Sequence, residues 1–273
     1  MVLINLPDNQ LILTNSMQQQ EVQFIDLGQM EYQQAWDYQE RLLQENIRRK
    51  KIYKDAQTVV SGNSVNENKF YRNEAISEPV LPQTQHYLLF VEHPPVYTLG
   101  KSGKEEHVLI NEEKRIEKGI TYIKTNRGGD ITFHGPEQLV GYPILDLEYF
   151  YTDIGKYLRN LEEVLILTLK EYGLQGERSA GETGVWLDAL VLGEERKICA
   201  IGVRCSRWIT MHGFAFNINT DLSYFDDIIP CGIRNKKVTT LEKELGRKIP
   251  MEEVKGIVKS NFEKVFAARL IGA

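Results

Sequence analysis

Cysteine is scarce in this chain, with three among 273 residues. Cys199, Cys205 and Cys231 are odd in number and form no CxxC pair. A disulfide framework requires an even set of paired cysteines and a structural zinc site requires clustered ligands, so we expect neither. Histidines and carboxylates also lack the spacing of a metal-ligand set, and we therefore predict no metal and no cofactor.

Long apolar runs and an excess of one charge are also missing. No stretch is apolar over enough residues to cross a bilayer, and the first residues do not form a basic segment followed by an apolar one. Lysine and arginine total 33 against 38 aspartates and glutamates, with both signs interspersed. This balance argues against a nucleic-acid or membrane partner. We expect a cytoplasmic protein, in which a free thiol can persist.

Apolar sequence is plentiful, at 42% of residues, which is enough for one sizeable core. Alternating or continuous apolar runs predict strands at 22–27, 87–91, 120–124, 138–147, 184–192, 197–203, 208–210 and 214–218. Helical spacing predicts helices at 31–51, 153–172 and 251–270, and short helical pieces at 111–118, 221–225 and 239–243. We interpret residues 1–21 as an N-terminal extension and the turn-rich 54–85 as an inserted surface loop, functional or idle.

Cys231 is a candidate nucleophile because Pro230 and Gly232 flank it and predict a tight turn with an accessible thiol. Cysteine attacks as the thiolate, and its ordinary pKa is about 8.5. A nearby cation lowers that pKa, and Lys197 is our candidate for the cation. The alternative is a small buried apolar cysteine, which is what we expect of Cys199 and Cys205.

A glycine pair and two histidines are further candidates. Glycines such as Gly128 and Gly129 let backbone N–H groups approach a ligand oxygen, although turns use the same pair. His134 and His212 each precede a glycine, and a Cys–His pair is the usual alternative to Cys–Lys. For both histidines a hydrogen-bonded structural role remains open.

Several motifs occur together in one order along the chain. They are 26–28 with Tyr32 and Trp36, 92–100, 127–136, 197–204, 212–215 and 230–233. In this combination the chain resembles the lipoyl(octanoyl) transferases of the biotin/lipoate protein ligase superfamily, from about residue 22 to 245. The resemblance implies one catalytic domain over 22–273, with a mixed, largely antiparallel sheet flanked by helices.

The resemblance also implies an acyltransferase mechanism. Octanoyl arrives as a thioester on acyl carrier protein, moves to Cys231, and ends as an amide on a lysine of a lipoyl domain or the glycine-cleavage H protein. Lys197 matches the residue that lowers the pKa of the cysteine. The matching substrate-binding residues are Arg127, Gly128, Gly129, Asp130, Ile131, Thr132, Phe133, His134, Ala200, Ile201, Gly202, Gly213, Phe214 and Ala215.

Two departures from the family pattern and two rival functions accompany this hypothesis. Asp130 stands where the family usually has glutamine, and the insertion at 54–85 is atypical. The basic runs 48–51 and 234–237 are either docking patches for acidic partners or ordinary solvated charges.

The rival functions are an ATP-dependent lipoate or biotin ligase of the same superfamily and a non-catalytic scaffold with a fossil pocket.

Overall fold

The computed structural model describes residues 19–62, 83–229 and 237–272. Its main sheet contains eight strands in the order β10-β8-β9-β6-β2-β1-β11, with β7 also pairing to β8, and a smaller sheet has the order β4-β3-β5. The strands are β1 Gln20–Gln29, β2 His86–Glu92, β3 Val96–Leu99, β4 Thr121–Lys124, β5 Ile131–His134, β6 Gln138–Ile144, β7 Gly184–Leu187, β8 Arg196–Ser206, β9 Ile209–Asn217, β10 Lys237–Val238 and β11 Ala268–Ile271.

Helices flank the main sheet on both sides. They are α1 Tyr32–Gly62, α2 Glu112–Glu117, α3 Ile154–Glu171, α4 Leu241–Leu245 and α5 Met251–Phe266, with 3-10 turns η1 Glu105–His107, η2 Leu147–Tyr149 and η3 Leu222–Asp227. The pairs β8–β9, β9–β6 and β6–β2 are antiparallel, whereas β10–β8, β2–β1 and β1–β11 are parallel. The mixed, largely antiparallel sheet with flanking helices confirms the expected fold class. Within the described ranges, no helix is long and apolar enough to cross a membrane.

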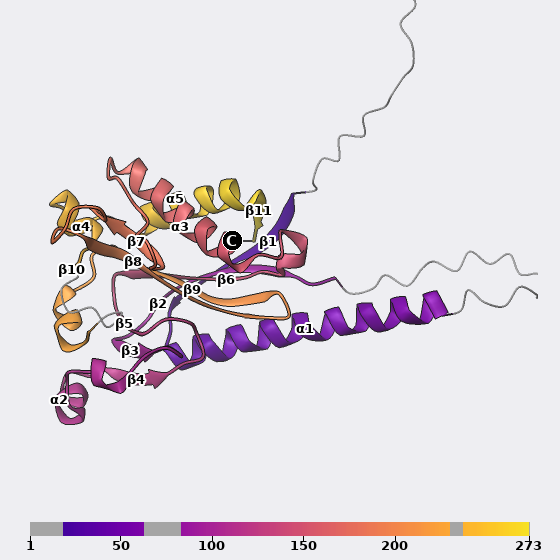
Figure 1. The fold of residues 1–273 in the computed structure, drawn as a ribbon, viewed down its shortest axis with the longest axis horizontal. Coiled ribbons are helices and arrows are strands. Elements are labelled where there is room, and N and C mark those ends of the chain that lie inside the picture. The colour runs from indigo at the N-terminus through magenta and orange to yellow at the C-terminus, as the bar shows by residue number, and fades with distance from the viewer. Residues whose placement is uncertain (1–18, 63–82, 230–236, 273) are drawn as a thin grey trace, which may run out of the picture.

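The two faces of the main sheet are covered differently. Helices α3 and α5 pack side by side on one face, and α1 lies along the opposite face and extends past the edge of the sheet (Figure 1). The α3 side holds the largest apolar cluster, which includes Leu161, Leu165 and Phe262. A smaller cluster, which includes Leu43, Tyr142 and Met211, fills the α1 side.

Helix α3 shows how local sequence sets these layers. The Asp153 side chain accepts a hydrogen bond from the Lys156 backbone N–H and so caps the first turn. Leu161, Leu165 and Leu169 recur at helical spacing and are fully buried against the sheet. Gly173 follows with φ +74°, a left-handed conformation that ends the helix at little steric cost.

The structure corrects several predicted boundaries. Helix α1 continues through Gly62, so residues 54–62 of the predicted loop are helical, and 63–82 lie outside the described residues. The predicted final helix ends at Phe266, because Ala267 turns left-handed (φ 48°) and lets β11 join β1. The predicted strand 184–192 stops at Leu187, since the chain turns back toward β8.

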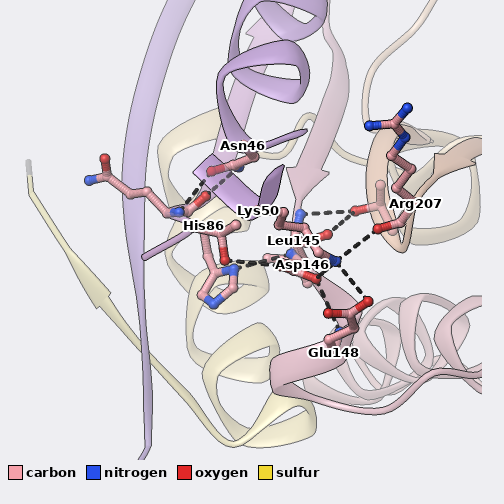
Figure 2. A network of polar contacts seen from close by, with 10 residues as sticks. Asn46, Lys50, His86, Leu145, Asp146, Glu148 and Arg207 are labelled. Atoms are coloured by element: carbon pink, nitrogen blue, oxygen red, sulfur yellow. Dashed lines mark hydrogen bonds and ion pairs between the residues drawn. The ribbon is translucent and has the colours of Figure 1, made fainter. Parts of the chain in front are cut away.

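A buried polar network fastens the middle of α1 to the sheet (Figure 2). Lys50 Nζ lies 2.9 Å from Asp146 Oδ1 and also donates to the Arg207 carbonyl at 2.9 Å. Glu148 completes the charge cluster at 3.0 Å from Lys50 Nζ. The network therefore connects α1 with the chain after β6 and with the β8–β9 hairpin.

Candidate active site

A cavity of about 570 Å³ lies where β5, β8 and β9 approach the loop 127–130. Its volume falls in the range of about 300–1,000 Å³ that is typical of small-molecule sites. Most of the predicted site residues line it, namely Arg127, Gly128, Gly129, Asp130, Ile131, Thr132, His134, Lys197, Ala200, Ile201, Gly202, Gly213, Phe214 and Ala215. Segments far apart in the sequence thus converge on one cavity.

Phe133 is the exception among the predicted substrate-binding residues. Its ring stacks on Tyr224 with centroids 4.5 Å apart and belongs to the apolar cluster of the small sheet. Along β5, Phe133 points to the face opposite Thr132 and His134, whereas Ile131, at the start of the strand, belongs both to the cavity wall and to this cluster. The structure therefore places Phe133 outside the wall of this cavity, and its contact with substrate stays a prediction.

Cys231 lies outside the described residues, but both ends of its segment are anchored. On the upstream side, Ile229 donates its backbone N–H to the His107 carbonyl at 2.8 Å. On the downstream side, Val238 pairs with Lys197 in the parallel β10–β8 ladder, and the Thr239 N–H donates to the Lys197 carbonyl at 3.0 Å. Residues 237–239, which follow Cys231 in the sequence, therefore lie directly beside Lys197.

Lys197 is 7% exposed and lines the cavity from β8. Its ammonium lies 4.5 Å from the centroid of the Trp186 ring on the neighbouring strand β7. Trp186 is itself 1% exposed, so the pair is shielded from water. The apolar pattern of 184–187 predicts a strand, but it does not reveal that the tryptophan covers the lysine.

Arg127 organises the loop over the cavity. Its Nη2 atom donates to the Thr98 carbonyl at 2.5 Å and to Thr98 Oγ1 at 2.8 Å. Next to it, the Gly128 N–H donates to the Val203 carbonyl at 2.9 Å and docks the loop on β8. A Cβ at Gly202 would lie 2.9 Å from the Gly128 carbonyl oxygen, so glycine there permits this approach.

Three buried histidines surround the start of α1. Burial lowers the pKa of His93 to about 4 and that of His212 to about 3, and holds the pKa of His134 well below its ordinary value. His134 lies between Gln138 Oε1, 2.9 Å from its Nδ1, and Thr98 Oγ1, 3.2 Å from its Nε2. All three imidazoles are consequently neutral at pH 7.

These histidines are embedded in aromatic rings. Tyr32 stacks on His134 with centroids 5.5 Å apart, and Trp36 contacts His212 at 5.9 Å. Tyr32, which belongs to the first motif, also lines the cavity, and burial raises its pKa to about 12. Its place in the motif with residues 26–28 was the signal in the sequence for a role at the site.

Asp130, the departure from the family pattern, is fixed at the cavity wall. One carboxylate oxygen lies 2.6 Å from His107 Nδ1, and the other accepts the Ile131 N–H at 2.7 Å. Because His107 also holds Ile229 through its carbonyl, Asp130 is linked to the segment that leads to Cys231.

Metal ligands are not gathered at the site. Over the ranges that the structure describes, no group of three or more His, Cys, Asp or Glu side chains is placed to hold a metal ion.

Comparison with known proteins gives a consistent family. The lipoyl protein ligase A/B catalytic domain model matches residues 31–263. An octanoyltransferase of Christiangramia forsetii is 53% identical over 92% of this chain and 97% of that protein. An octanoyltransferase of Flavobacterium johnsoniae is 52% identical over 92% of this chain and 99% of its own length.

Solved structures agree at the level of the fold. A lipoate-protein ligase A bound with ATP superposes with a TM-score of 0.62 at 14% identity, covering 92% of this chain and 90% of that one. A bipartite lipoate protein ligase from Thermoplasma acidophilum gives 0.60 at 16% identity over 93% and 88%. With the cavity, the family model and the close relatives in agreement, this chain belongs to the lipoyl protein ligase A/B catalytic family and, within it, to the octanoyltransferases.

Proposed function

We propose that the octanoyl group is carried as a thioester on Cys231, and that Lys197 keeps the sulfur ionised. The observation that supports this most is the convergence of Lys197 with loop 127–130, 200–202 and 213–215 around one cavity. The return of the chain from Cys231 to pair beside Lys197 in β10 supports the same arrangement. An ammonium shielded from water interacts with a thiolate more strongly than one in bulk solvent.

The reaction proceeds in two acyl transfers. The Cys231 thiolate attacks the carbonyl carbon of the donor thioester, the donor C–S bond breaks, and the departing thiolate takes up a proton. A lysine amine of the acceptor then attacks the acyl-enzyme, loses a proton, and releases the Cys231 thiolate as the amide forms. The first exchange is nearly isoenergetic and the second runs downhill, so neither requires ATP. Backbone N–H groups at the cavity would stabilise the oxyanion of each tetrahedral intermediate.

The partners in this proposal are octanoyl-acyl carrier protein as donor and lipoyl domains or the glycine-cleavage H protein as acceptors. Of the predicted basic docking runs, 234–236 lies outside the described residues. In the run 48–51, Arg48 and Arg49 pair with Glu45 and Lys50 pairs with Asp146. These ion pairs favour a structural role for that run over capture of an acidic partner.

Mass spectrometry of the intact protein tests the proposal. After mixing with octanoyl-acyl carrier protein, the wild type should gain one octanoyl group, and Cys231→Ala should gain none. Lys197→Ala should acylate at least about tenfold more slowly at pH 7, because it loses thiolate. Leu190→Ala, at a surface position that is 88% exposed, is the matched control and should behave as wild type. Transfer by Cys231→Ala at the wild-type rate would show that no covalent intermediate forms.

The same assay separates the rival functions. An ATP-dependent ligase would form product from free octanoate and ATP without acyl carrier protein, and a scaffold would never acylate. The relatives at 52–53% identity are octanoyltransferases, whereas the ligase structures at 14–16% identity share the fold alone.

A further inference from the structure

The β7–β8 pairing contains a one-residue irregularity beside the candidate lysine. Gly184 and Val185 pair with Ala200 and Cys199, but Trp186 pairs with Lys197. Ile198 is therefore an extra residue on β8, which makes this a β-bulge. Bulges bend a strand and redirect its side chains, and they occur often next to active sites.

The bulge determines which face of the sheet Lys197 occupies. Ile198 and Cys199 both belong to the apolar cluster under α3, as does Val185 across the strand pair. In a regular strand, Lys197 would share the face of Cys199 two residues away and would enter that apolar cluster. With the bulge it instead lies opposite Trp186, and its side chain lines the cavity. A charged amine avoids burial among aliphatic side chains in this way.

On its own face, Lys197 is held between an aromatic ring and backbone. Its Nζ atom lies 4.5 Å from the centroid of the Trp186 ring, the distance of a cation–π contact. On another side, a Cβ placed on Gly184 would come within 3.4 Å of Lys197 Cε, so the lysine stem passes close to the Gly184 backbone. The Gly184 N–H is itself fixed by the buried carboxylate of Glu162 at 3.1 Å.

We propose that Trp186 is a positioning residue for Lys197: its ring face attracts the ammonium and fixes it at the cavity wall, once the bulge at Ile198 has turned both side chains to the same face. The proposal rests on the function proposed for Lys197 and adds that the Trp186 ring holds the Lys197 ammonium in position. Tryptophan suits this role because its ring attracts a cation more strongly than that of phenylalanine, and an aliphatic side chain does not attract one at all.

The first test measures the rate of alkylation of Cys231 by iodoacetamide against pH, at the level of the peptide, together with single-turnover acylation by octanoyl-acyl carrier protein. For Trp186→Leu we expect the pH midpoint to rise by about one unit and acylation at pH 7 to slow about tenfold, with Trp186→Phe in between. The control variant Phe262→Leu removes a buried ring of α5 that belongs to the apolar cluster under α3 and does not line the cavity. It should lower Tm without moving the midpoint.

The second test keeps the shape of the indole and is independent of folding defects. Tryptophan carrying one, two or three fluorine atoms, incorporated at position 186 alone, withdraws electron density from the ring face in steps. We expect the alkylation midpoint to rise and acylation to slow in the same order. If neither the alkylation midpoint nor the acylation rate changes with the number of fluorine atoms, Trp186 does not position Lys197. That conclusion would hold even if Lys197→Ala shifts the midpoint as the proposed function requires. If Lys197→Ala shifts nothing, the proposed function of Lys197 fails, and the role of Trp186 fails with it.

Discussion

The two faces of the main sheet bury different kinds of side chain. The α3–α5 face is filled mostly by aliphatic and aromatic side chains such as Leu161, Leu165 and Phe262, with a few buried polar ones such as Glu162 and Thr168. The α1 face buries polar groups, among them Gln39 and His212 and, in the network of Figure 2, Asn46 and Asp146. Apolar packing is non-directional and stabilises any compact arrangement, whereas a buried polar group is tolerated only where its partners are fixed. We infer that the α3–α5 face supplies stability and that the α1 face fixes geometry for the site.

Lowering the pH should destabilise the α1 side of the sheet in particular, and we expect this to be the strongest difference between the two faces. His93, His134 and His212 lie on the α1 side, and burial holds the pKa of each below 6.5 in the folded protein. The unfolded chain takes up protons near pH 6.5 and the folded one does not until about pH 4 or below, so stability falls as the pH drops through that window. Each histidine should contribute up to about 1.4 kcal/mol per pH unit, measured by urea unfolding between pH 6.5 and 5.5.

Replacing one of these histidines tests whether its protonation causes the loss of stability at low pH. His93→Gln retains a side chain that can bond to the Met30 carbonyl and the Tyr142 hydroxyl but cannot titrate. The slope of unfolding free energy against pH should therefore decrease by about one proton's contribution. An unchanged slope would show that the buried imidazole of His93 does not contribute to the loss of stability in acid.

A cavity on the apolar face should affect stability alone. Leu165→Ala removes a fully buried side chain from α3 and should cost about 2–5 kcal/mol of unfolding free energy. At a temperature where the variant is still folded, single-turnover acylation should match the wild type, because Leu165 does not line the cavity. A large fall in the acylation rate would break the proposed division between the faces.

The Lys50–Asp146 pair should yield a smaller loss that can be restored. Lys50→Met leaves the Asp146 carboxylate, which is fully buried, without its ammonium partner. We expect a loss of about 2 kcal/mol, below the range for a fully enclosed pair because the lysine reaches solvent at one edge. Adding Asp146→Asn removes the buried charge and should recover most of that loss in chemical denaturation. A double variant no more stable than the single one would show that charge burial is not the cause.

The contrast between the faces also explains what the sequence could predict. Helix α3 is recognisable because its leucines follow one period and Asp153 caps it. The motif residues could be grouped because they recur in a known order. The single-residue bulge at Ile198 could not be predicted, because nothing in the pattern 197–203 differs from a regular strand. The same holds for β11, whose pairing with β1 depends on a left-handed Ala267.

Phe133 offers the finest test, since it stands in sequence between two residues that line the cavity, Thr132 and His134. Its ring packs against Tyr224 and Phe225 of η3, and its Cζ atom would lie 2.3 Å from a Cβ on Gly135. Phe133→Leu should therefore cost about 1 kcal/mol of stability through lost ring contacts, and leave the preference for acyl chain length unchanged. Acyl carrier protein carrying chains of several lengths, compared by intact mass, measures that preference. Ala215→Val, which narrows the cavity wall, should shift it toward shorter chains, and a shift of equal size in Phe133→Leu would place that ring at the acyl chain after all.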